Sequence, residues 1–397
     1  MEDLEFLIIG CGPAGAQAAR EAARFGIETV VLEKDAIVGV KRVCAAGLRP
    51  GYCTTFDLPT ELIHFNTPRM ALFDEEGDCH AFPVGPAHTT TREELDGTMA
   101  QFAQQAGAHV RTQALYRAHR VERDRTTVEY ADQQSGIRKK IRARNVFFAT
   151  GATARLERDE QFAFPKWEDG LLTCYQYRVY LERPAEPVAY STLELHYFRA
   201  ANGRQIVAWM FPKRDHLTVG LGVMGKMPGK ALRAELERFQ ARVAARLYPG
   251  VQSRIKEEGH LLYGGRPRPS ISSGSLMVGG TAAGLVDATN GEGIFEAAMS
   301  GRLAAEAVAT HRNAPARAAQ RYDAAVKGRF YARLKHRNTL MRFLERKPRR
   351  FSVLFEQLAT TPRFAEILQR EDSYLSMTDR FYLYGQALKF AKNALPI

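Results

Sequence analysis

The sequence lacks the features that would place it outside the class of soluble globular proteins. No apolar run approaches the ~20 residues that a membrane-spanning helix needs. The five cysteines form no Cys-x-x-Cys pair and show no zinc spacing, so we expect reduced thiols and no metal site. The first ten residues carry acids where a secretory signal would carry Lys or Arg, so we expect a cytoplasmic protein. The 397 residues, 45% apolar and 10% aromatic, suffice for about two or three domains.

Negative charge is scarce in one segment. From Arg312 to Arg350, 13 Lys and Arg residues stand against two acids, so this stretch carries most of the net charge of +12. Apolar and aromatic residues are interleaved with the charges, which predicts an amphipathic helical region. The segment could contact an anionic membrane, an acidic protein or nucleic acid, or form only a solvated helix face. Because no nucleic-acid-binding module is recognisable, we expect no contact with nucleic acid.

The amino-terminal residues have the pattern of a dinucleotide-binding fold. Leu4 to Ile9 predicts a buried parallel strand, an Ala-rich helix follows to about Phe25, and a second strand over 28–32 ends in Glu33. In the glycine turn between the first strand and the helix, one glycine permits the turn, one lets a pyrophosphate approach the backbone, and one lets the helix pack on the strand. The cofactor contacts predicted here are Gly10, Gly12, Pro13, Ala14, Gly15 and, for an adenosine ribose, Glu33.

A second glycine-rich turn lies far along the chain. Leu276 to Val278 predicts an apolar strand, the turn follows it, and a long helix runs from about Phe295 to Thr310. A glycine turn at a helix start is a second candidate anion site. Arg92 opens another predicted helix, where it could reach a phosphate or only cap and solvate the helix. A ligand touched by both ends of the chain must be long, so FAD fits better than NAD.

These motifs resemble the geranylgeranyl reductase family, within the para-hydroxybenzoate hydroxylase class of flavoproteins, over essentially the whole chain. The segment 44–48 is similar to the family's segment beside the flavin. Most distinctive is Trp209-Met210-Phe211-Pro212, followed after seven residues by Gly220-Leu221-Gly222, which is similar to the family's lipid-site signature. The resemblance implies substrate contacts at Trp209, Phe211, Pro212, Gly220 and Gly222. It implies further FAD contacts at Cys44, Ala45, Gly47, Arg92, Gly151, Gly280, Thr281, Gly284, Gly291, Gly293 and Ile294.

The sequence departs from the family pattern in three places. Val207 stands where the lipid-site signature has Tyr, and Thr281 stands where the family has Asp. A hydroxyl binds a ribityl hydroxyl more weakly than a carboxylate does, so we expect weaker FAD binding than in relatives. The Asp-Gly motif with which related hydroxylases handle NADPH reads Ala149-Thr150-Gly151, which counts modestly against monooxygenase chemistry.

The patterns and the resemblance together predict an α/β fold, α+β overall. A Rossmann-like FAD-binding domain would comprise residues 1–155 and 266–310. An antiparallel-sheet substrate domain would comprise residues 156–265, where the sequence alternates as strands do. A basic helical region would comprise residues 311–397, and the resemblance implies that its final stretch, from Phe351 to Ile397, closes the cavity.

The activity that the resemblance implies is an FAD-dependent reductase. It would saturate double bonds of a geranylgeranyl-type chain on a lipid or chlorophyll-like pigment by hydride transfer from reduced flavin. Cys44 is the candidate catalytic residue, although a packed thiol that contacts FAD through its backbone fits equally well. For Glu292, in a Gly-Glu-Gly turn, we expect a structural hydrogen-bonding role.

Because only one complete nucleotide fingerprint is present, the reductant would be external, either NADPH or reduced ferredoxin. Arg312 to Arg350 would dock an acidic donor or, slightly better supported by the interleaved aromatics, hold the enzyme peripherally on the cytoplasmic membrane face. The alternatives are an FAD-dependent monooxygenase of an apolar or aromatic substrate and a non-catalytic flavoprotein scaffold.

Overall fold

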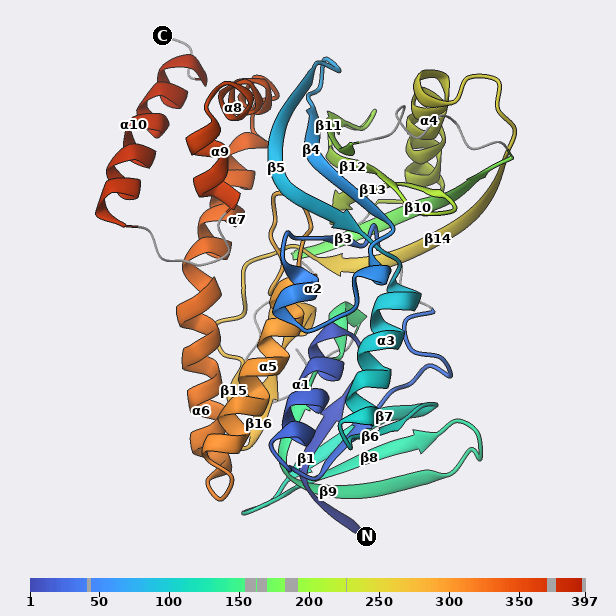
Figure 1. The fold of residues 1–397 in the computed structure, drawn as a ribbon, viewed down its shortest axis with the longest axis vertical. Helices are drawn as coiled ribbons and strands as arrows, with labels where there is room; N and C mark the ends of the chain where they lie inside the picture. The colour runs from blue at the N-terminus through green and yellow to red at the C-terminus, as the bar shows by residue number, and fades with distance from the viewer. Residues whose placement is uncertain are drawn as a thin grey trace.

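The computed structural model describes residues 1–40, 44–153, 162, 170–182, 192–225, 227–369 and 376–394. The predicted α/β fold is confirmed: two sheets and a set of helices pack together. Figure 1 shows the first sheet in the lower half, the second sheet in the upper half, and a helical column along both.

The first sheet is the core of the predicted FAD-binding domain. Its strands are β1 (Glu2–Ile9), β2 (Thr29–Leu32), β6 (His109–Arg111), β7 (Ala114–Val121), β8 (Thr126–Asp132), β9 (Arg138–Phe148), β15 (Ser272–Ser273) and β16 (Leu276–Val278). They follow the order β15-β16-β9-β1-β2-β6, and β8 joins β7 to β9. The five strands from β16 to β6 pair in parallel, so their carboxyl ends meet at one edge, where ligands of such sheets bind.

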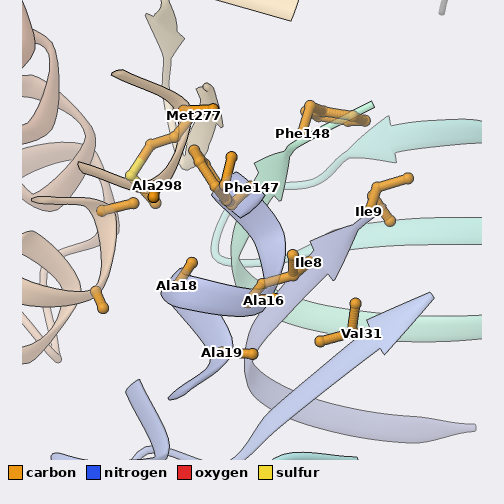
Figure 2. Close-up of a cluster of buried hydrophobic side chains, with 14 of the residues drawn as sticks. Ile8, Ile9, Ala16, Ala18, Ala19, Val31, Phe147, Phe148, Met277 and Ala298 are labelled. Carbon is orange, nitrogen blue, oxygen red and sulfur yellow. The ribbon is translucent and has the colours of Figure 1, made fainter. Parts of the chain in front are cut away.

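Small residues bring helices close to this sheet. The helices are α1 (Pro13–Arg24), α3 (Arg92–Gln105), α5 (Ile294–Thr310) and α6 (Pro315–Val326). A Cβ at Gly301 of α5 would lie 2.0 Å from the carbonyl oxygen of Ala14, so α1 and α5 cross in near-backbone contact. Figure 2 shows the alanines of α1 and α5 beside larger side chains of the strands, such as Ile8, Phe147 and Met277.

The second sheet is larger than the predicted substrate domain. Its strands are β3 (Gly47–Leu48), β4 (Phe65–Phe73), β5 (Cys79–Thr89), β10 (Leu171–Leu181), β11 (Leu193–Arg199), β12 (Gln205–Pro212), β13 (Leu217–Met224) and β14 (Ser253–Tyr263). Their order is β14-β10-β13-β12-β11-β4-β5-β3. The segment 47–89, which the sequence analysis included in the FAD-binding domain, therefore contributes three strands to this sheet. The junction is the parallel pairing of β4 with β11, a long-range contact that no local pattern reveals.

Alternation along β12 divides the second sheet into two faces. Ile206, Ala208 and Met210 pack beneath α4 (Gly229–Leu247). Val207, Trp209 and Phe211 belong to an apolar cluster on the other face, which the C-terminal helices cover. The site signature therefore lies on the face that the C-terminal region covers.

The carboxyl-terminal region is helical, as predicted. After α6 the chain passes through a π-helical turn, η7 (Lys327–Tyr331), into α7 (Ala332–Leu344). There follow α8 (Arg349–Thr360), α9 (Pro362–Gln369) and α10 (Met377–Ala394). The remaining short helices are α2 (Tyr52–Thr55), η1 (Thr60–Leu62), η2 (Gly151–Thr153) and η6 (Gly280–Ala283). In the parts of the chain that the structure describes, no helix is long and apolar enough to span a bilayer.

The basic segment is less available for partners than its composition indicates. Arg312, Lys327, Arg333 and Arg337 each pair with an acid of this chain. The apolar residues between the charges are mostly buried, including Phe330, Tyr331, Leu334, Met341 and Leu344. Any membrane contact of this segment would therefore depend on charge alone.

Candidate functional site: a cofactor cradle beneath an apolar cluster

The glycine turn between β1 and α1 has one open position. A Cβ at Gly15 would lie 1.9 Å from the carbonyl oxygen of Gly10, so Gly15 is needed where the helix packs on the strand. A Cβ at Gly12 would meet nothing closer than the Arg92 guanidinium, 3.7 Å away. No side chain caps the amino terminus of α1, where Gly12 is the N-cap and Pro13 the first helical residue. Amides of a helix start without a side-chain cap, beside a bare glycine, fit a phosphate group.

Glu33 stands at the carboxyl end of β2 and is almost completely buried. Its carboxylate accepts hydrogen bonds from the backbone N–H of Cys11, at 2.7 Å, and of Asp35, at 3.0 Å. These bonds orient the carboxylate at the edge of the sheet. A carboxylate accepts about four hydrogen bonds, so its predicted contact with a ribose is chemically compatible with these two.

Arg92 is the first residue of α3, and Thr91 caps this helix. Its guanidinium donates two hydrogen bonds to Asp96, at 2.8 and 2.6 Å. Burial lowers the pKa of Arg92, but attraction to the Asp96 carboxylate outweighs burial and raises the pKa overall. The result is a permanently charged, oriented guanidinium near Gly12, where the Asp96 carboxylate, 3.9 Å from a Cβ at that position, offsets part of the charge.

The second glycine-rich turn contacts the start of α1. A Cβ at Gly280 would lie 3.4 Å from the Cβ of Ala14, so two segments that are far apart in the sequence meet here. The backbone N–H of Gly280 donates to the Ser300 hydroxyl at 3.0 Å and is therefore not directed at a ligand. Thr281 is half-buried, and Gly284 ends η6 in the left-handed conformation. Gly151 is the first residue of η2, which lies close to η6.

Glu292 belongs to a buried ion network. Arg49 donates to Glu292 and, at 2.5 Å, to Glu296, which also accepts from Arg333 at 2.5 Å. Burial and the nearby Glu296 raise the pKa of Glu292. The network holds the turn that contains Gly291, Gly293 and Ile294 against the chain after Cys44. The sequence analysis missed Arg49, because its partners lie more than 240 residues away.

The segment after Cys44 packs under the lipid-site signature, so two motifs far apart in the sequence meet. A Cβ at Gly47 would lie 2.8 Å from the Phe211 ring. The backbone N–H of Ala46 donates to the Cys44 sulfur at 3.3 Å. The side chain of Lys213 donates to the carbonyl oxygens of Ala45, at 2.5 Å, and Ala46, at 3.4 Å.

The spacing of the signature follows from the sheet register. Trp209 on β12 lies opposite Gly220 on β13, and a Cβ there would come within 2.4 Å of the indole ring. A Cβ at Gly222 would lie 3.2 Å from the sulfur of Cys174. The glycines thus leave room for the indole to lie across the sheet. The indole N–H is buried and has no acceptor among the described residues, as expected beside a ligand site. Pro212 ends β12, where its carbonyl oxygen accepts from Thr89 at 2.6 Å.

Lys213 is the residue that sequence reasoning missed at the centre of the site. Burial lowers its pKa to about 7, the nearby Cys44 thiol opposes this shift, and Arg178 adds to it. Its backbone N–H donates to the carbonyl oxygen of His216 at 2.8 Å. The buried His216 ring in turn contacts the exposed carboxylate of Asp215 at 2.7 Å. The signal available in the sequence was a lysine directly after an apolar strand and its proline.

Comparisons with known proteins show the family of the chain. The FAD-binding domain family matches residues 3–324. A geranylgeranyl diphosphate reductase of Synechocystis is 28% identical over 328 residues, 78% of this chain and 76% of the relative. A digeranylgeranylglycerophospholipid reductase of Methanopyrus kandleri is 29% identical over 312 residues, 77% of this chain and 80% of the relative.

Solved structures share the fold. A geranylgeranyl bacteriochlorophyll reductase-like protein of Thermoplasma acidophilum covers 100% of both chains, with a TM-score of 0.76 and 20% identity. A p-nitrophenol 4-monooxygenase of Pseudomonas putida covers 94% of this chain and 100% of its own, with a TM-score of 0.70 and 17% identity. The resemblance to geranylgeranyl reductases is thus confirmed. The match over residues 3–324 shows that this chain belongs to the FAD-binding domain family, which is a family of flavin-dependent oxidoreductases.

Proposed function

We propose that the protein is an FAD-dependent reductase that saturates double bonds of a geranylgeranyl-type prenyl chain on a lipid or chlorophyll-like pigment. The observation that carries the proposal is the apolar cluster in which Trp209 and Phe211 lie directly above the segment after Cys44. An apolar, aromatic surface suits a hydrocarbon chain that offers no hydrogen bonds. The reductase names of the curated relatives support the same substrate class.

The cradle residues take defined roles in this proposal. The amides at the start of α1, Glu33 and Arg92 would hold the pyrophosphate and ribose of FAD, and the chain around Ala45 and Gly47 would lie beside its flavin ring. When bound and reduced by the external donor, the flavin of FAD would supply the hydride for the double bond. Thr281, Gly284, Gly151 and the turn from Gly291 to Ile294 would line the remaining length of the cofactor.

Reducing an isolated double bond also needs a proton at the second carbon. Cys44 and Lys213 are the candidates, because both lie where the cofactor segment meets the apolar cluster. A buried amine whose pKa is lowered to about 7 can donate a proton near neutral pH. We assign Lys213 as the source of the proton, and we keep Cys44 as the candidate residue beside the reacting carbon. Trp209 and Phe211 would exclude water and align the chain.

The finer expectations on partners stay proposals. An external reductant, NADPH or reduced ferredoxin, would reload the cofactor. Exposed members of Arg312–Arg350, such as Arg317 and Arg321, are available to an acidic donor or an anionic membrane.

The decisive experiment is an anaerobic single turnover. The chemically reduced holoenzyme is mixed with prenyl lipid extracts, and the lipids are weighed by mass spectrometry. A gain of two hydrogens per double bond, together with flavin reoxidation, is expected. Phe211→Ala should slow this step, whereas Phe25→Ala, a change of the same residue type at an exposed position, should not. Unchanged lipid masses, with hydroxylated product on admitting air, would replace the proposal with the monooxygenase alternative.

A further inference from the structure

The last helix, α10, has two apolar faces. Tyr382, Leu383 and Phe390 point inward and pack on the apolar cluster that contains Trp209 and Phe211. Large apolar side chains also lie on the outer face: Met377, Phe381, Tyr384 and Leu388, exposed by 65, 70, 66 and 55%. These four make up the outer stripe.

The outer stripe has the geometry of a binding face. Its residues are spaced four, three and four apart, which aligns them along one side of the helix over about 16 Å. Figure 1 shows α10 as the outermost helix, beside α8 and α9. A contiguous exposed row of large apolar side chains marks an interaction site more often than scattered single residues do.

Positive charge surrounds this stripe. Arg380, Lys389 and Lys392 are exposed on α10. The only acid of the helix, Asp379, is buried, where it accepts from Ser376 and lies 3.8 Å from Arg363. Near the end of α10, the ring centroids of Phe390 and Phe343 lie 6.0 Å apart. The exposed Arg346, Lys347 and Arg349 follow Phe343 along the chain. Among the described residues, the exposed acids of α8 and α9 are Glu356 and Glu366, and the exposed Glu76 contacts Ser352 of α8.

We propose that the outer stripe of α10 inserts into the surface of an anionic lipid bilayer. An apolar row flanked by Lys and Arg is the pattern of a helix that lies in the bilayer interface. The inner face of the same helix packs on the apolar cluster that contains Trp209 and Phe211, so one helix would join the bilayer surface to the candidate site. The inference rests on the proposed function, because a reductase of prenyl lipids would meet its substrate at a bilayer. It places the apolar part of the contact on α10, and the end of Arg312–Arg350 contributes only flanking charge, from Arg346, Lys347 and Arg349.

The test is flotation of the full-length holoenzyme with vesicles that contain no prenyl chain. Vesicles of phosphatidylcholine with about a quarter phosphatidylglycerol should carry the protein upward, and those of phosphatidylcholine alone should carry less. Phe381→Ser with Tyr384→Ser should weaken binding about tenfold or more, since both side chains lose their apolar contact. Lys389→Glu with Lys392→Glu should weaken binding to the phosphatidylglycerol-containing vesicles by about fivefold per charge. The same changes should leave binding to pure phosphatidylcholine vesicles unaltered.

Ile137→Ser is the matched control, because it removes another large apolar side chain that is exposed. Ile137 is 58% exposed and lies in the turn before β9. It should bind vesicles as the unaltered chain does. The inference is overturned if the unaltered holoenzyme does not float, or if Phe381→Ser with Tyr384→Ser floats equally well. It is also overturned if those changes halve the molecular mass in solution without altering flotation, since the stripe then joins two copies.

Turnover on a detergent-dispersed prenyl lipid separates this inference from the proposed function. Reduction without flotation rejects the bilayer contact and leaves the reductase intact. Flotation without reduction rejects the reductase and leaves α10 as a membrane-binding helix.

Discussion

At the scale of single residues, the site is unusual for what it buries. Lys213 places an amine inside the protein, and its two nearest acceptors are the uncharged carbonyl oxygens of Ala45 and Ala46. Its surroundings are not acidic: Arg178 and the His216 ring lie nearby, and the opposing influence on its pKa is the Cys44 thiol. Buried groups with shifted pKa values are concentrated at functional sites, which makes Lys213 a candidate for a role in the chemistry.

We predict that Lys213 sets the upper pH limit of turnover. Its pKa is about 7 in the folded protein, so the amine loses its proton as pH rises through neutrality, and the single-turnover rate should fall. Lys213→Met should slow the reaction about a hundredfold and abolish this decline. Lys213→Arg keeps a positive charge that does not titrate in this range, so its rate should not fall near pH 7. Stopped-flow flavin reoxidation between pH 6 and about 9 measures this.

The pH dependence of protein stability is a second measure of the lowered Lys213 pKa. The unfolded chain holds this proton up to about 10.5 and the folded chain only to about 7, so the free energy of unfolding should rise with pH between these values. Lys213→Met should lose that part of the rise, whereas Lys230→Met, at an exposed lysine of α4, should keep it.

The rate experiment has an outcome that contradicts this role of Lys213. If Lys213→Met retains the same decline of the turnover rate near neutrality, the proton comes from another group, and Cys44 is the next candidate.

At the scale of elements, the strand–turn–helix unit was the most predictable part of the chain. The strand predicted to begin at Leu4 is β1, and the helix predicted to run to about Phe25 is α1. Local patterns determine such elements, because burial and turn chemistry act within a few residues. The sheet membership of β4 was not accessible, since its partner β11 lies about 120 residues away. The same limit hid Arg49.

We predict that two glycines of this unit can be separated by experiment. Gly12 has an ordinary backbone φ of −75° and an open Cβ position, so Gly12→Ala should leave the apoprotein within about 1 kcal/mol of its normal stability. The added methyl faces the proposed pyrophosphate site and should weaken FAD binding about tenfold or more. Gly15→Ala forces a Cβ to within 1.9 Å of the Gly10 carbonyl oxygen and should cost the apoprotein about 1–3 kcal/mol.

Urea unfolding without FAD and a fluorescence titration with FAD distinguish these outcomes. Each variant serves as the control for the other, because both add one methyl group to the same turn. Equal loss of apoprotein stability in both would show that Gly12 is a packing glycine, and the pyrophosphate assignment would then lose its main support.

At the scale of the whole molecule, the carboxyl-terminal helices are tied to the cofactor side by buried charge. The sequence indicated a basic surface in this region, and charge counting alone could not show that several of its cations point inward. Arg333 reaches Glu296 of α5, and Arg337 lies 3.6 Å from Asp287, in the chain between η6 and α5. Arg337 also donates to the Thr289 hydroxyl and to the Leu368 carbonyl oxygen at the end of α9.

We predict that Arg337→Met loosens the helical region from the rest of the molecule. The change leaves the Asp287 carboxylate buried without its cation, which should lower the free energy of unfolding by about 3 kcal/mol at neutral pH. Burial raises the pKa of Asp287, but Arg337 and Thr289 outweigh burial and lower it overall, so its contribution to stability is present at neutral pH and lost in acid. The defect should therefore persist down to about pH 4 and shrink only as pH falls below 3.8, the ordinary pKa of an Asp carboxyl.

Arg342→Met is the matched control, because Arg342 is exposed on the same helix and its loss should change stability by less than about 0.5 kcal/mol. Urea unfolding followed both by far-ultraviolet circular dichroism and by tryptophan fluorescence measures the effect. Trp209 lies in the apolar cluster that the C-terminal helices cover, so in a Trp167→Phe background its fluorescence in Arg337→Met should change at a lower urea concentration than the helical signal does. Coincident, unshifted transitions would mean that the apolar contacts alone hold the helices in place, and that Arg337 serves the cofactor turn rather than the joining of the two halves.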